Sequence, residues 1–271
     1  MTLEFTKMHG AGNDFVTLDN RDGRHNITPE IVARLCDRHF GIGADGLLLL
    51  ERPDGDGLDA RMVYYNSDGS RGEMCGNGAR CFTAFALANG VGTAGGVRFM
   101  TDAGVISATA RGDLYTIQMT RPADTRLNVK VDLESGPATV HYSNTGVPHV
   151  VRFVDDVESV DIRREGAELR FHQEFAPKGA NANFARIGED GVILLRTYER
   201  GVEDETLACG TGVTATAILA HLVRGLDKPV TVQVRGGDRL SVDFEVDEKG
   251  EADHVLMTGP AQTVFTGVIE L

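Results

Sequence analysis

Two stretches of the chain carry the same turn: Glu73-Met74-Cys75-Gly76-Asn77-Gly78-Ala79 and Thr206-Leu207-Ala208-Cys209-Gly210-Thr211-Gly212-Val213. In each stretch a Cys-Gly-x-Gly sequence precedes a run with almost no polar face, over residues 81–88 in the first copy and 214–223 in the second. A helix that is apolar all round has to be buried on every side. We therefore expect each half of the chain to wrap other structure around one central helix, with a cysteine at the N-terminus of that helix.

The similarity extends to the flanks of the two turns. A strand-like run precedes each turn, at residues 61–66 and 192–198, and a β-rich stretch broken by glycine follows each helix, at residues 97–119 and 230–246. Chance similarity between two glycine-rich turns would not extend to their flanks and spacing. The repeat therefore indicates two similar domains that face each other.

A weakly patterned stretch, residues 122–137, is where we place the domain boundary. The predicted N-terminal domain covers residues 1–122 and the predicted C-terminal domain covers residues 123–261, each with one of the two repeated cysteines. The last run of the chain alternates between apolar and polar residues and is able to complete either sheet. A strand over residues 262–271 is therefore a candidate addition to the N-terminal domain.

The composition is that of a soluble globular protein, with 41% hydrophobic and 25% charged residues among 271. The formal charge of −13 argues against nucleic acid or an anionic membrane as a partner. No apolar run approaches the roughly 20 residues of a membrane span, and the first residues alternate instead of forming a signal peptide. Four cysteines in a chain of this length are not a secreted disulfide framework. We expect a cytoplasmic protein.

Local patterns predict the other main elements. A helix should begin at Pro29, because Thr28 is a favoured N-cap residue and proline suits the first helical position, and it should end near Gly41. A charged amphipathic segment is expected at residues 160–169, followed by a loop at residues 178–183. Strands are expected at residues 3–8, 15–19, 47–50, 139–142 and 149–154.

The sequence Gly41-Ile42-Gly43-Ala44-Asp45-Gly46 matches the letters of the dinucleotide-binding fingerprint. That fingerprint needs a strand before it and a helix after it, so that the helix dipole meets the pyrophosphate. Here a predicted helix precedes the motif and a predicted buried strand follows it. We therefore assign no nucleotide site to this motif.

The chemistry of the repeat follows from a cysteine at a helix N-terminus. Backbone N–H groups and the helix dipole favour the thiolate there, and the same N–H groups can bind a carboxylate. Two such sites facing each other would place two thiols on either side of one small anion. One thiolate could then remove a proton from a carbon while the other thiol returns a proton to the opposite face, with no metal or cofactor.

The other cysteines have simpler interpretations. Cys36 and Cys81 are expected to be buried apolar residues, no Cys/His set has the spacing of a metal site, and no Cys-x-x-Cys redox pair is present. His149, which follows a Gly-x-Pro turn, and Glu199, ten residues before Cys209, are the best candidates to assist the thiols.

The chain resembles the diaminopimelate epimerase family from end to end, and in the family's order. The residues that carry the resemblance are Lys7-Met8-His9-Gly10-Ala11-Gly12-Asn13-Asp14-Phe15, Gly41 to Gly46, Tyr65-Asn66-Ser67-Asp68-Gly69-Ser70, Met74 to Cys81, Tyr198-Glu199-Arg200-Gly201 and Ala208 to Gly212. The resemblance implies an α/β (α+β) fold with two pseudo-symmetric domains, each a curved, mainly antiparallel sheet wrapped around a central helix. It also implies a PLP-independent isomerase that interconverts LL- and meso-diaminopimelate for lysine and peptidoglycan-precursor biosynthesis, as a homodimer without cofactor or metal.

The resemblance also implies roles for individual residues. The catalytic residues carried over by position are Cys75 and Cys209 as the two bases, with His149 and Glu199 in support of proton transfer. The substrate-binding residues carried over by position are Asn13, Asn66, Gly76, Asn77, Asn181, Glu199, Arg200, Gly210 and Thr211. These residue types suit the task, because the helix N-termini can bind the carboxylate at the reacting carbon while Arg200 and the asparagines hold the distal amino-acid end.

Two positions depart from the family pattern. Val147 stands where many members have asparagine, and Gly46 stands where some members carry a glutamine for the distal end of the substrate. Two other readings of the sequence therefore stay open. One is a related cofactor-independent racemase or isomerase acting on another amino acid, such as the proline racemase or phenazine-biosynthesis types. The other is a binding protein that kept the fold without catalysis.

Overall fold

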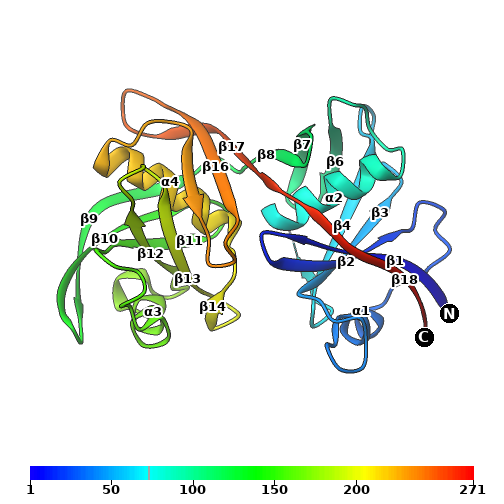
Figure 1. Cartoon of the computed structure of the whole chain (residues 1–271), viewed down its shortest axis with the longest axis horizontal. Coiled ribbons are helices and arrows are strands. Elements are labelled where there is room, and N and C mark those ends of the chain that lie inside the picture. The colour runs from blue at the N-terminus through cyan, green and yellow to red at the C-terminus, as the bar shows by residue number, and fades with distance from the viewer. Residues whose placement is uncertain (73) are drawn as a thin grey trace. The chain divides into compact units, whose positions relative to one another are not determined.

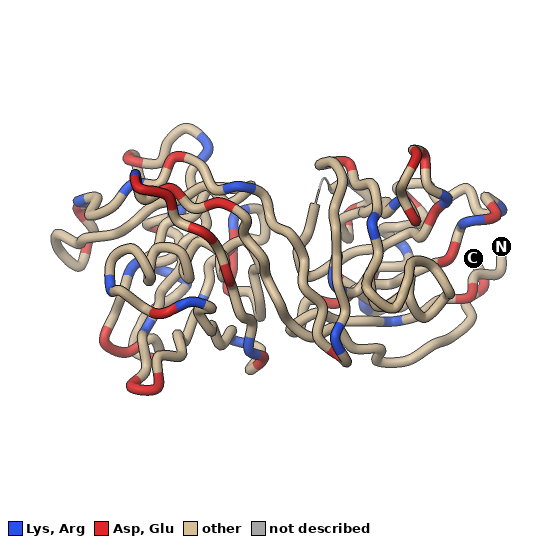
Figure 2. The backbone as a smooth tube through the Cα atoms, turned by 90° about the horizontal axis from the view of Figure 1, so that it is seen from above, with Lys and Arg blue, Asp and Glu red and all other residues tan. Residues whose placement is uncertain are grey.

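The computed structural model describes residues 1–72 and 74–271, which form two compact units. Unit 1 comprises Met1–Gln118 and Gly259–Leu271, and unit 2 comprises Met119–Thr258. Acidic residues outnumber basic ones, 40 to 27, and both kinds are spread along the backbone of the two units (Figure 2). No helix in the described part of the chain has the length and apolar character needed to cross a membrane.

The described residues of unit 1 form two helices and one sheet (Figure 1). Its helices are α1 (Pro29–Cys36) and α2 (Gly76–Ala88). Its strands are β1 (Thr2–Gly10), β2 (Asn13–Asp19), β3 (Gly46–Glu51), β4 (Ala60–Asn66), β5 (Arg71–Gly72), β6 (Val97–Thr101), β7 (Gly104–Arg111), β8 (Leu114–Gln118) and β18 (Gln262–Glu270).

Unit 2 has a matching set of elements. Its helices are α3 (Ile162–Arg170), α4 (Gly210–Arg224) and the 3-10 turn η1 (Gln173–Phe175). Its strands are β9 (Ala123–Leu133), β10 (Gly136–Asn144), β11 (Pro148–Phe153), β12 (Asn181–Ile187), β13 (Ile193–Glu199), β14 (Asp204–Thr206), β15 (Val230–Gln233), β16 (Arg239–Val246) and β17 (Ala252–Pro260).

Strand pairing repeats from one unit to the other. The sheet of unit 1 runs in the order β18-β1-β2-β3-β4-β6-β7-β8, and that of unit 2 in the order β9-β10-β11-β12-β13-β15-β16-β17. The parallel pairs fall at the same places, β2/β3 and β4/β6 in unit 1 and β11/β12 and β13/β15 in unit 2. The other pairs are antiparallel, so the predicted fold class is confirmed.

The central helices are buried as their sequences predict. In α2 the residues from Gly76 to Thr83 are all buried, and in α4 those from Gly212 to Ala220 are. Figure 1 shows each of these helices lying among the strands of its own unit. The sheet of each unit covers most of its central helix, and the exposed residues of the two helices, Ala88 and Arg224, lie at the C-terminal ends.

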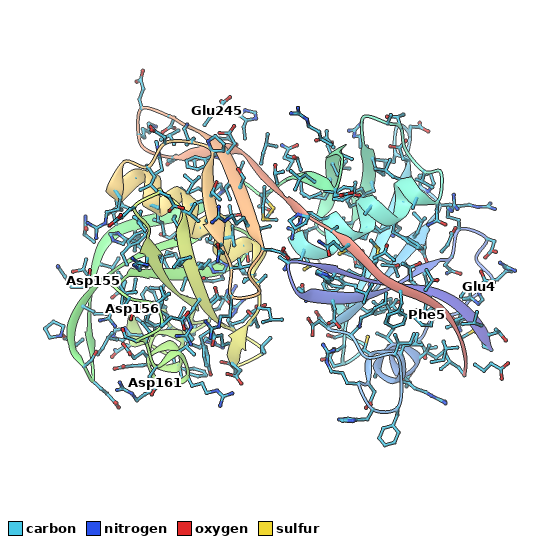
Figure 3. All side chains as sticks on the ribbon, viewed as in Figure 1. Glu4, Phe5, Asp155, Asp156, Asp161 and Glu245 are labelled. Carbon is cyan, nitrogen blue, oxygen red and sulfur yellow. The ribbon has the colours of Figure 1, made fainter. Side chains whose placement is uncertain are left out.

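The opposite face of each sheet packs on a second helix. In unit 1, α1 covers β3, which explains why Leu47, Leu48, Leu49 and Leu50 are all buried: both faces of that strand are covered. In unit 2, α3 takes the equivalent place, and Asp161 at its N-terminus (Figure 3) accepts a hydrogen bond from the backbone N–H of Arg164. Each sheet therefore lies between two helices.

Three predictions about local structure are wrong. Helix α1 ends at Cys36, and the backbone from there to Gly43 turns back onto Leu35 and Cys36. Residues 122–137 include the long strand β9, which was missed because it lies at a sheet edge and most of its residues are exposed, so its apolar periodicity is weak. The segment from 178 to 183 is not all loop, since β12 begins at Asn181.

Gly46 lies where a side chain would collide with the neighbouring strand. A Cβ atom at this position would lie 2.6 Å from the carbonyl oxygen of Tyr65 and 2.9 Å from Cε2 of Tyr64. Real Cβ atoms essentially never approach this closely, so β3 or Tyr64 would have to shift. The glutamine that some family members have here therefore requires a different local packing.

Gly46→Gln should destabilise the protein by about 1–3 kcal/mol, because strand β4 has to yield to the new side chain. The control is Gly95→Gln in the same unit, where a Cβ atom meets only Thr93 Oγ1 at 3.6 Å. Urea denaturation should give a lower midpoint for the first variant and an unchanged midpoint for the second. Equal midpoints for the two variants would show that Gly46 is not tightly packed.

Candidate active site

Cys75 lies at the N-terminus of the buried helix α2, as its N-cap residue. Its Sγ is 3.5 Å from the backbone nitrogen of Gly78, which donates to it. Its own S–H donates to Asn13 Oδ1 at 3.6 Å, and Asn13 is the first residue of β2. The thiol therefore lies between a backbone donor of the helix and a side-chain acceptor from the sheet.

The side chain of Asn13 is fixed in one orientation. Its Oδ1 accepts a second hydrogen bond, from Asn77 Nδ2 at 3.2 Å, and its Nδ2 donates to Asp45 Oδ2 at 2.7 Å. The amide of Asn77 is oriented in turn by Arg80, a fully buried arginine that donates to Asn77 Oδ1 at 3.0 Å. Since a carboxylate can only accept, Asn13 has to present its oxygen to Cys75.

A network of charges supports Asn13. Asp45 accepts from Arg38, which also forms two hydrogen bonds with Asp14, and Lys7 lies 2.7 Å from Asp14. Burial alone would raise the pKa of Asp14, but the hydrogen bonds and charges of Arg38 and Lys7 outweigh it and hold that pKa at about 2. Asp45 belongs to the motif that resembles a nucleotide fingerprint, so this motif anchors Asn13.

Cys209 takes the same place on α4, as its N-cap residue. Its Sγ lies 3.4 Å from Thr211 Oγ1, in the first turn of the helix. Thr211 Oγ1 lies 2.9 Å from His149 Nε2, and the Thr211 carbonyl accepts from Thr145. The Cys209 thiol therefore lies beside the Thr211 hydroxyl, which is hydrogen-bonded to His149.

His149 is completely buried in β11 and has one defined tautomer. Asn183 Nδ2 lies 3.2 Å from His149 Nδ1, and it lies 3.0 and 3.3 Å from the carbonyl oxygens of Val150 and Asn181, which can only accept, so its two hydrogens are shared among three acceptors. The amide nitrogen therefore faces Nδ1, so Nδ1 is the acceptor and Nε2 carries the hydrogen. Nε2–H then donates to Thr211 Oγ1, which leaves the hydroxyl hydrogen for Cys209 Sγ.

The environment of His149 keeps its ring neutral. Burial, helped by the charge of Arg200, lowers the pKa of His149 to about 3. The ring is therefore uncharged at neutral pH and acts as a fixed hydrogen-bond donor toward Thr211.

The other predicted residues lie at the ends of strands or at the first positions of helices in the two units. Asn181 Oδ1 accepts from the backbone N–H of Arg200 at 2.8 Å, and Glu199 Oε2 accepts from Thr206 at 2.8 Å. Asn66 is the last residue of β4 and bonds to the side chains of Tyr64 and Ser70. Gly76 and Gly210 are the first residues of α2 and α4.

Strand register shows which residues of the two units correspond. His149 pairs with Asn181 in the parallel pair β11/β12, and Phe15 pairs with Gly46 in the parallel pair β2/β3. The second glycine of each Cys-Gly-x-Gly turn lies against the parallel strand pair of its own unit. Gly78 lies against Phe15 and Leu48, whereas Gly212 lies against His149 and Asn183. One thiol therefore has an apolar wall behind it and the other has a polar one.

The two remaining cysteines belong to the core. Cys36 and Cys81 are 4% and 0% exposed, and burial raises the pKa of each thiol to about 12. Both are therefore poor nucleophiles at neutral pH. Their burial agrees with the prediction made for them.

Several residues in these networks were missed in the sequence, among them Asp45, Arg80 and Asn183. Asp45 was set aside with the fingerprint-like motif, and Arg80 was passed over as part of an apolar helix. Asn183 was placed at the end of a loop. Had the strand been recognised, the alternation of Asn181 and Asn183 would have put both side chains on one face, toward His149.

Comparison with known proteins gives a consistent result. The family model described as Diaminopimelate epimerase matches residues 5–124 and 141–264. A curated diaminopimelate epimerase from Aquifex aeolicus (strain VF5) is 44% identical over 278 residues, covering 98% of this chain and 97% of the relative.

Solved structures of lower identity share the fold. A phenazine biosynthesis protein of the PhzF family from Bacillus anthracis aligns with a TM-score of 0.78 at 15% identity, covering 100% of both chains. A probable proline racemase from Agrobacterium radiobacter K84 aligns with a TM-score of 0.72 at 17% identity, covering 99% of this chain and 92% of that one. At such identities the likeness extends to the fold alone. The family match and the identity to a full-length relative go further: this chain belongs to the diaminopimelate epimerase family.

Proposed function

We propose that this protein is an isomerase that epimerises LL-diaminopimelate to meso-diaminopimelate with two cysteine bases and no cofactor. The observation that carries the proposal is the repeated placement of a cysteine at the N-cap of a buried helix, once in each of two units with the same strand order. Each helix N-terminus also offers backbone N–H groups to a carboxylate. The identity of the substrate is inferred from membership of the diaminopimelate epimerase family.

In the proposed reaction both cysteines act on one substrate. A thiolate removes the proton from the α-carbon, and the electron pair of the broken C–H bond is stabilised next to the carboxylate. The opposite thiol then donates its proton to the other face of the carbon, which inverts it. One proton leaves and one arrives, so no oxidant or cofactor is consumed. After each turnover the thiol and thiolate states are exchanged between the two cysteines.

Substrate-binding roles follow from the position of each residue. Gly76, Asn77, Gly210 and Thr211 lie in the first turns of the two helices, where N–H groups can hold the carboxylate at the reacting carbon. In this proposal Asn13, Asn66, Asn181, Glu199 and Arg200 hold the distal amino-acid end, with Glu199 also assisting proton transfer. Holding both ends orients the reacting carbon between the thiols.

The two thiols are not equivalent in this proposal. Cys75 accepts the Gly78 N–H, which favours a thiolate, but it donates its own S–H to Asn13 Oδ1 and has Phe15 and Leu48 behind its turn, and these two features favour the thiol. Cys209 has the Thr211 hydroxyl beside it, and His149 Nε2–H orients that hydroxyl toward the sulfur, which favours the thiolate. In the resting protein Cys209 is therefore the base and Cys75 is the acid.

Direct assay tests the proposed reaction. The reduced protein is incubated with LL-diaminopimelate in deuterium oxide, and the stereoisomers are resolved by chiral chromatography with mass detection. Meso-diaminopimelate carrying one deuterium at the α-carbon supports the proposal. Turnover of another amino acid in its place would remove the substrate assignment, and binding by calorimetry without deuterium exchange would identify a binding protein that has lost catalysis.

Cys75→Ala and Cys209→Ala should each lower epimerisation by roughly 10²–10⁴-fold, since inversion needs a base on one face and an acid on the other. Cys36→Ala is the control, because Cys36 is the last residue of α1, its thiol is buried in the core, and its loss should leave the rate unchanged. Rates are measured from both stereoisomers. Near-normal turnover by either active-site variant would contradict the paired-base assignment.

Iodoacetamide should alkylate Cys209 faster than Cys75 at neutral pH, because only the thiolate reacts. His149→Phe copies the Phe15 wall of unit 1 and should slow labelling of Cys209 by about tenfold without changing Cys75. His221→Phe is the control, since His221 bonds to the Leu226 carbonyl at the far end of α4. Peptide mapping by mass spectrometry gives both rates, and faster labelling of Cys75 would reverse the assignment of the resting states.

We also propose that the protein is a homodimer. Strand β18 forms one edge of the sheet in unit 1, and Val264, Phe265 and Val268 on it are 55%, 47% and 63% exposed. Phe5 on β1 (Figure 3) is buried and packs edge-to-face on Phe265, which holds the Phe265 ring at this edge. An exposed apolar edge strand is a surface that proteins normally cover.

Val268→Lys should convert the dimer to a monomer, because it places a charge in the middle of this edge. Val105→Lys, on exposed β7 in the same unit, is the control and should leave the dimer intact. Light scattering after size-exclusion chromatography measures the mass of each variant. A wild-type protein of 29.2 kDa would be a monomer and would overturn the proposal.

A further inference from the structure

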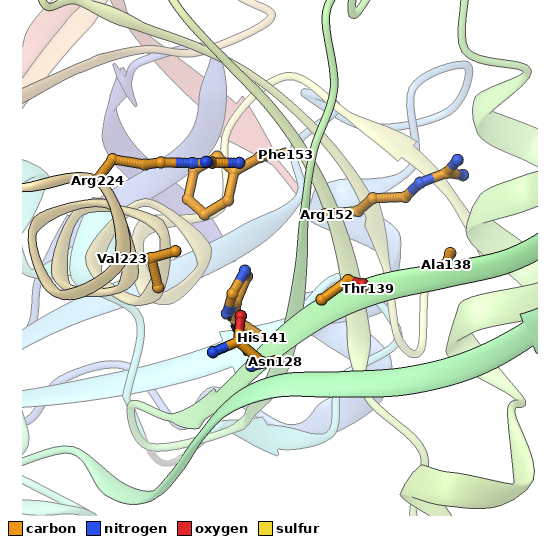
Figure 4. Close-up of a pocket in the computed structure, with 8 residues that line it drawn as sticks. All are labelled: Asn128, Ala138, Thr139, His141, Arg152, Phe153, Val223 and Arg224. Atoms are coloured by element: carbon orange, nitrogen blue, oxygen red, sulfur yellow. Dashed lines mark hydrogen bonds between the residues drawn. The ribbon is translucent and has the colours of Figure 1, made fainter.

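Unit 2 contains a pocket that none of the proposed catalytic residues lines. Its volume is about 330 Å³, and it is lined by Asn128, Ala138, Thr139, His141, Arg152, Phe153, Val223 and Arg224 (Figure 4). These residues come from β9, β10, β11 and the C-terminal end of α4, whereas Cys209 lies at the N-terminal end of that helix. The lining includes two arginines and a histidine but no acid, in a chain with a net charge of −13.

A β-bulge orients the histidine of this pocket. The register between β9 and β10 shifts around His141, so that two residues of β9 oppose it alone. One of these, Asn128, adopts a left-handed backbone conformation with φ of 57° and donates its N–H to His141 Nδ1 at 3.2 Å. This bond puts the ring hydrogen on Nε2. Burial and the charge of Arg224 lower the pKa of His141, so the ring is neutral and this N–H is its one donor.

Two donors of this pocket, His141 Nε2–H and the Arg224 guanidinium, have no acceptor among the residues that the structure describes. His141 is 4% exposed, and its Nε2–H has no hydrogen-bond partner in the described part of the chain. Arg224 stacks over Phe153 with its Cζ 5.5 Å from the ring centroid and forms no ion pair with any described residue. Arg152 differs, since it pairs with Glu165 at 2.8 Å. The nearly buried Nε2–H of His141 and the guanidinium of Arg224 therefore face one cavity, and no carboxylate of the described residues pairs with them.

The remaining lining residues and the volume of the pocket indicate what else a ligand has besides its anionic group. Figure 4 shows His141, Phe153 and Arg224 around one space, with Val223 beside them. The His141 and Phe153 rings are 5.6 Å apart between centroids. The volume lies in the range of pockets for small organic ligands, about 300–1,000 Å³.

We propose that this pocket, defined by His141, Phe153 and Arg224, is a second ligand site that binds a small organic anion. The carboxylate or phosphoryl group of the ligand accepts from His141 Nε2–H and from the Arg224 guanidinium, which can bind an oxyanion with two parallel hydrogen bonds. The apolar part of the ligand lies against Phe153 and Val223. The site is distinct from the one around Cys209 and does not depend on the proposed epimerase activity.

Titrations of the full-length protein followed by NMR test this site. Benzoate and phenyl phosphate are the probes for the two head groups, and benzamide is the uncharged control. We expect saturable shifts of the His141 ring and of the Asn128 amide with at least one anion, and none with benzamide. Which anion binds more tightly identifies the head group.

Matched variants separate a built site from general attraction of anions to arginine. Arg224→Gln should weaken binding by at least about tenfold, and Arg224→Lys, which keeps the charge without the planar fork, should fall between it and wild type. Arg186→Gln makes the same charge change at an exposed position on β12 and should bind as wild type does. Linear shifts without saturation in the wild-type protein, or equal binding by Arg224→Gln, would overturn the proposal.

Discussion

The backbone N–H groups at the first turns of α2 and α4 impose the constraint on which the rest of this structure depends. Both helices are buried almost completely at that end, so these groups have to be met by protein or by a ligand. A cysteine at the N-cap and glycines beside it leave the turn accessible to a small anion. The sheets that surround the helices supply the polar side chains that approach each turn.

The two units share a strand order but place different side chains beside the first turn of the central helix. In unit 1 a chain of ion pairs from Lys7 through Asp14 and Arg38 to Asp45 holds Asn13 in one orientation. In unit 2 the neutral pair of His149 and Asn183 performs the equivalent task without charges. The two units thus share a fold but differ in the side chains that surround their cysteines.

Much of this arrangement could be predicted from the sequence, because it depends on strong local signals. The repeated Cys-Gly-x-Gly turn and the apolar runs after it predicted two buried helices, and Thr28 before Pro29 predicted the start of α1. The family resemblance extended this to the fold and to a reaction, and the family match supports both. The sites of proton transfer remain predictions that the proposed variants test.

What the sequence did not reveal has physical reasons. Strand β9 lies at an edge and lacks an alternating apolar face, so its residues look like a linker. The link between Asp45 and Asn13 joins residues 32 positions apart, and that between Asn183 and His149 joins residues 34 apart. Such contacts depend on strand register, which local patterns do not fix. The tautomer of His149 follows from three hydrogen bonds that only the folded sheet brings together.

The strand order of unit 1 has a consequence for the order of events during synthesis. Strand β18 takes the place beside β1 that β9 takes beside β10, yet β9 directly precedes β10 in the chain while β18 follows β17. Unit 2 is a single continuous segment, so a ribosome delivers all of its strands before the last strand of unit 1 exists. Domains generally fold as units while the chain emerges. Unit 1, although its first residues are made earliest, is therefore the last to complete its sheet, and until then the outer edge of β1 has no partner strand.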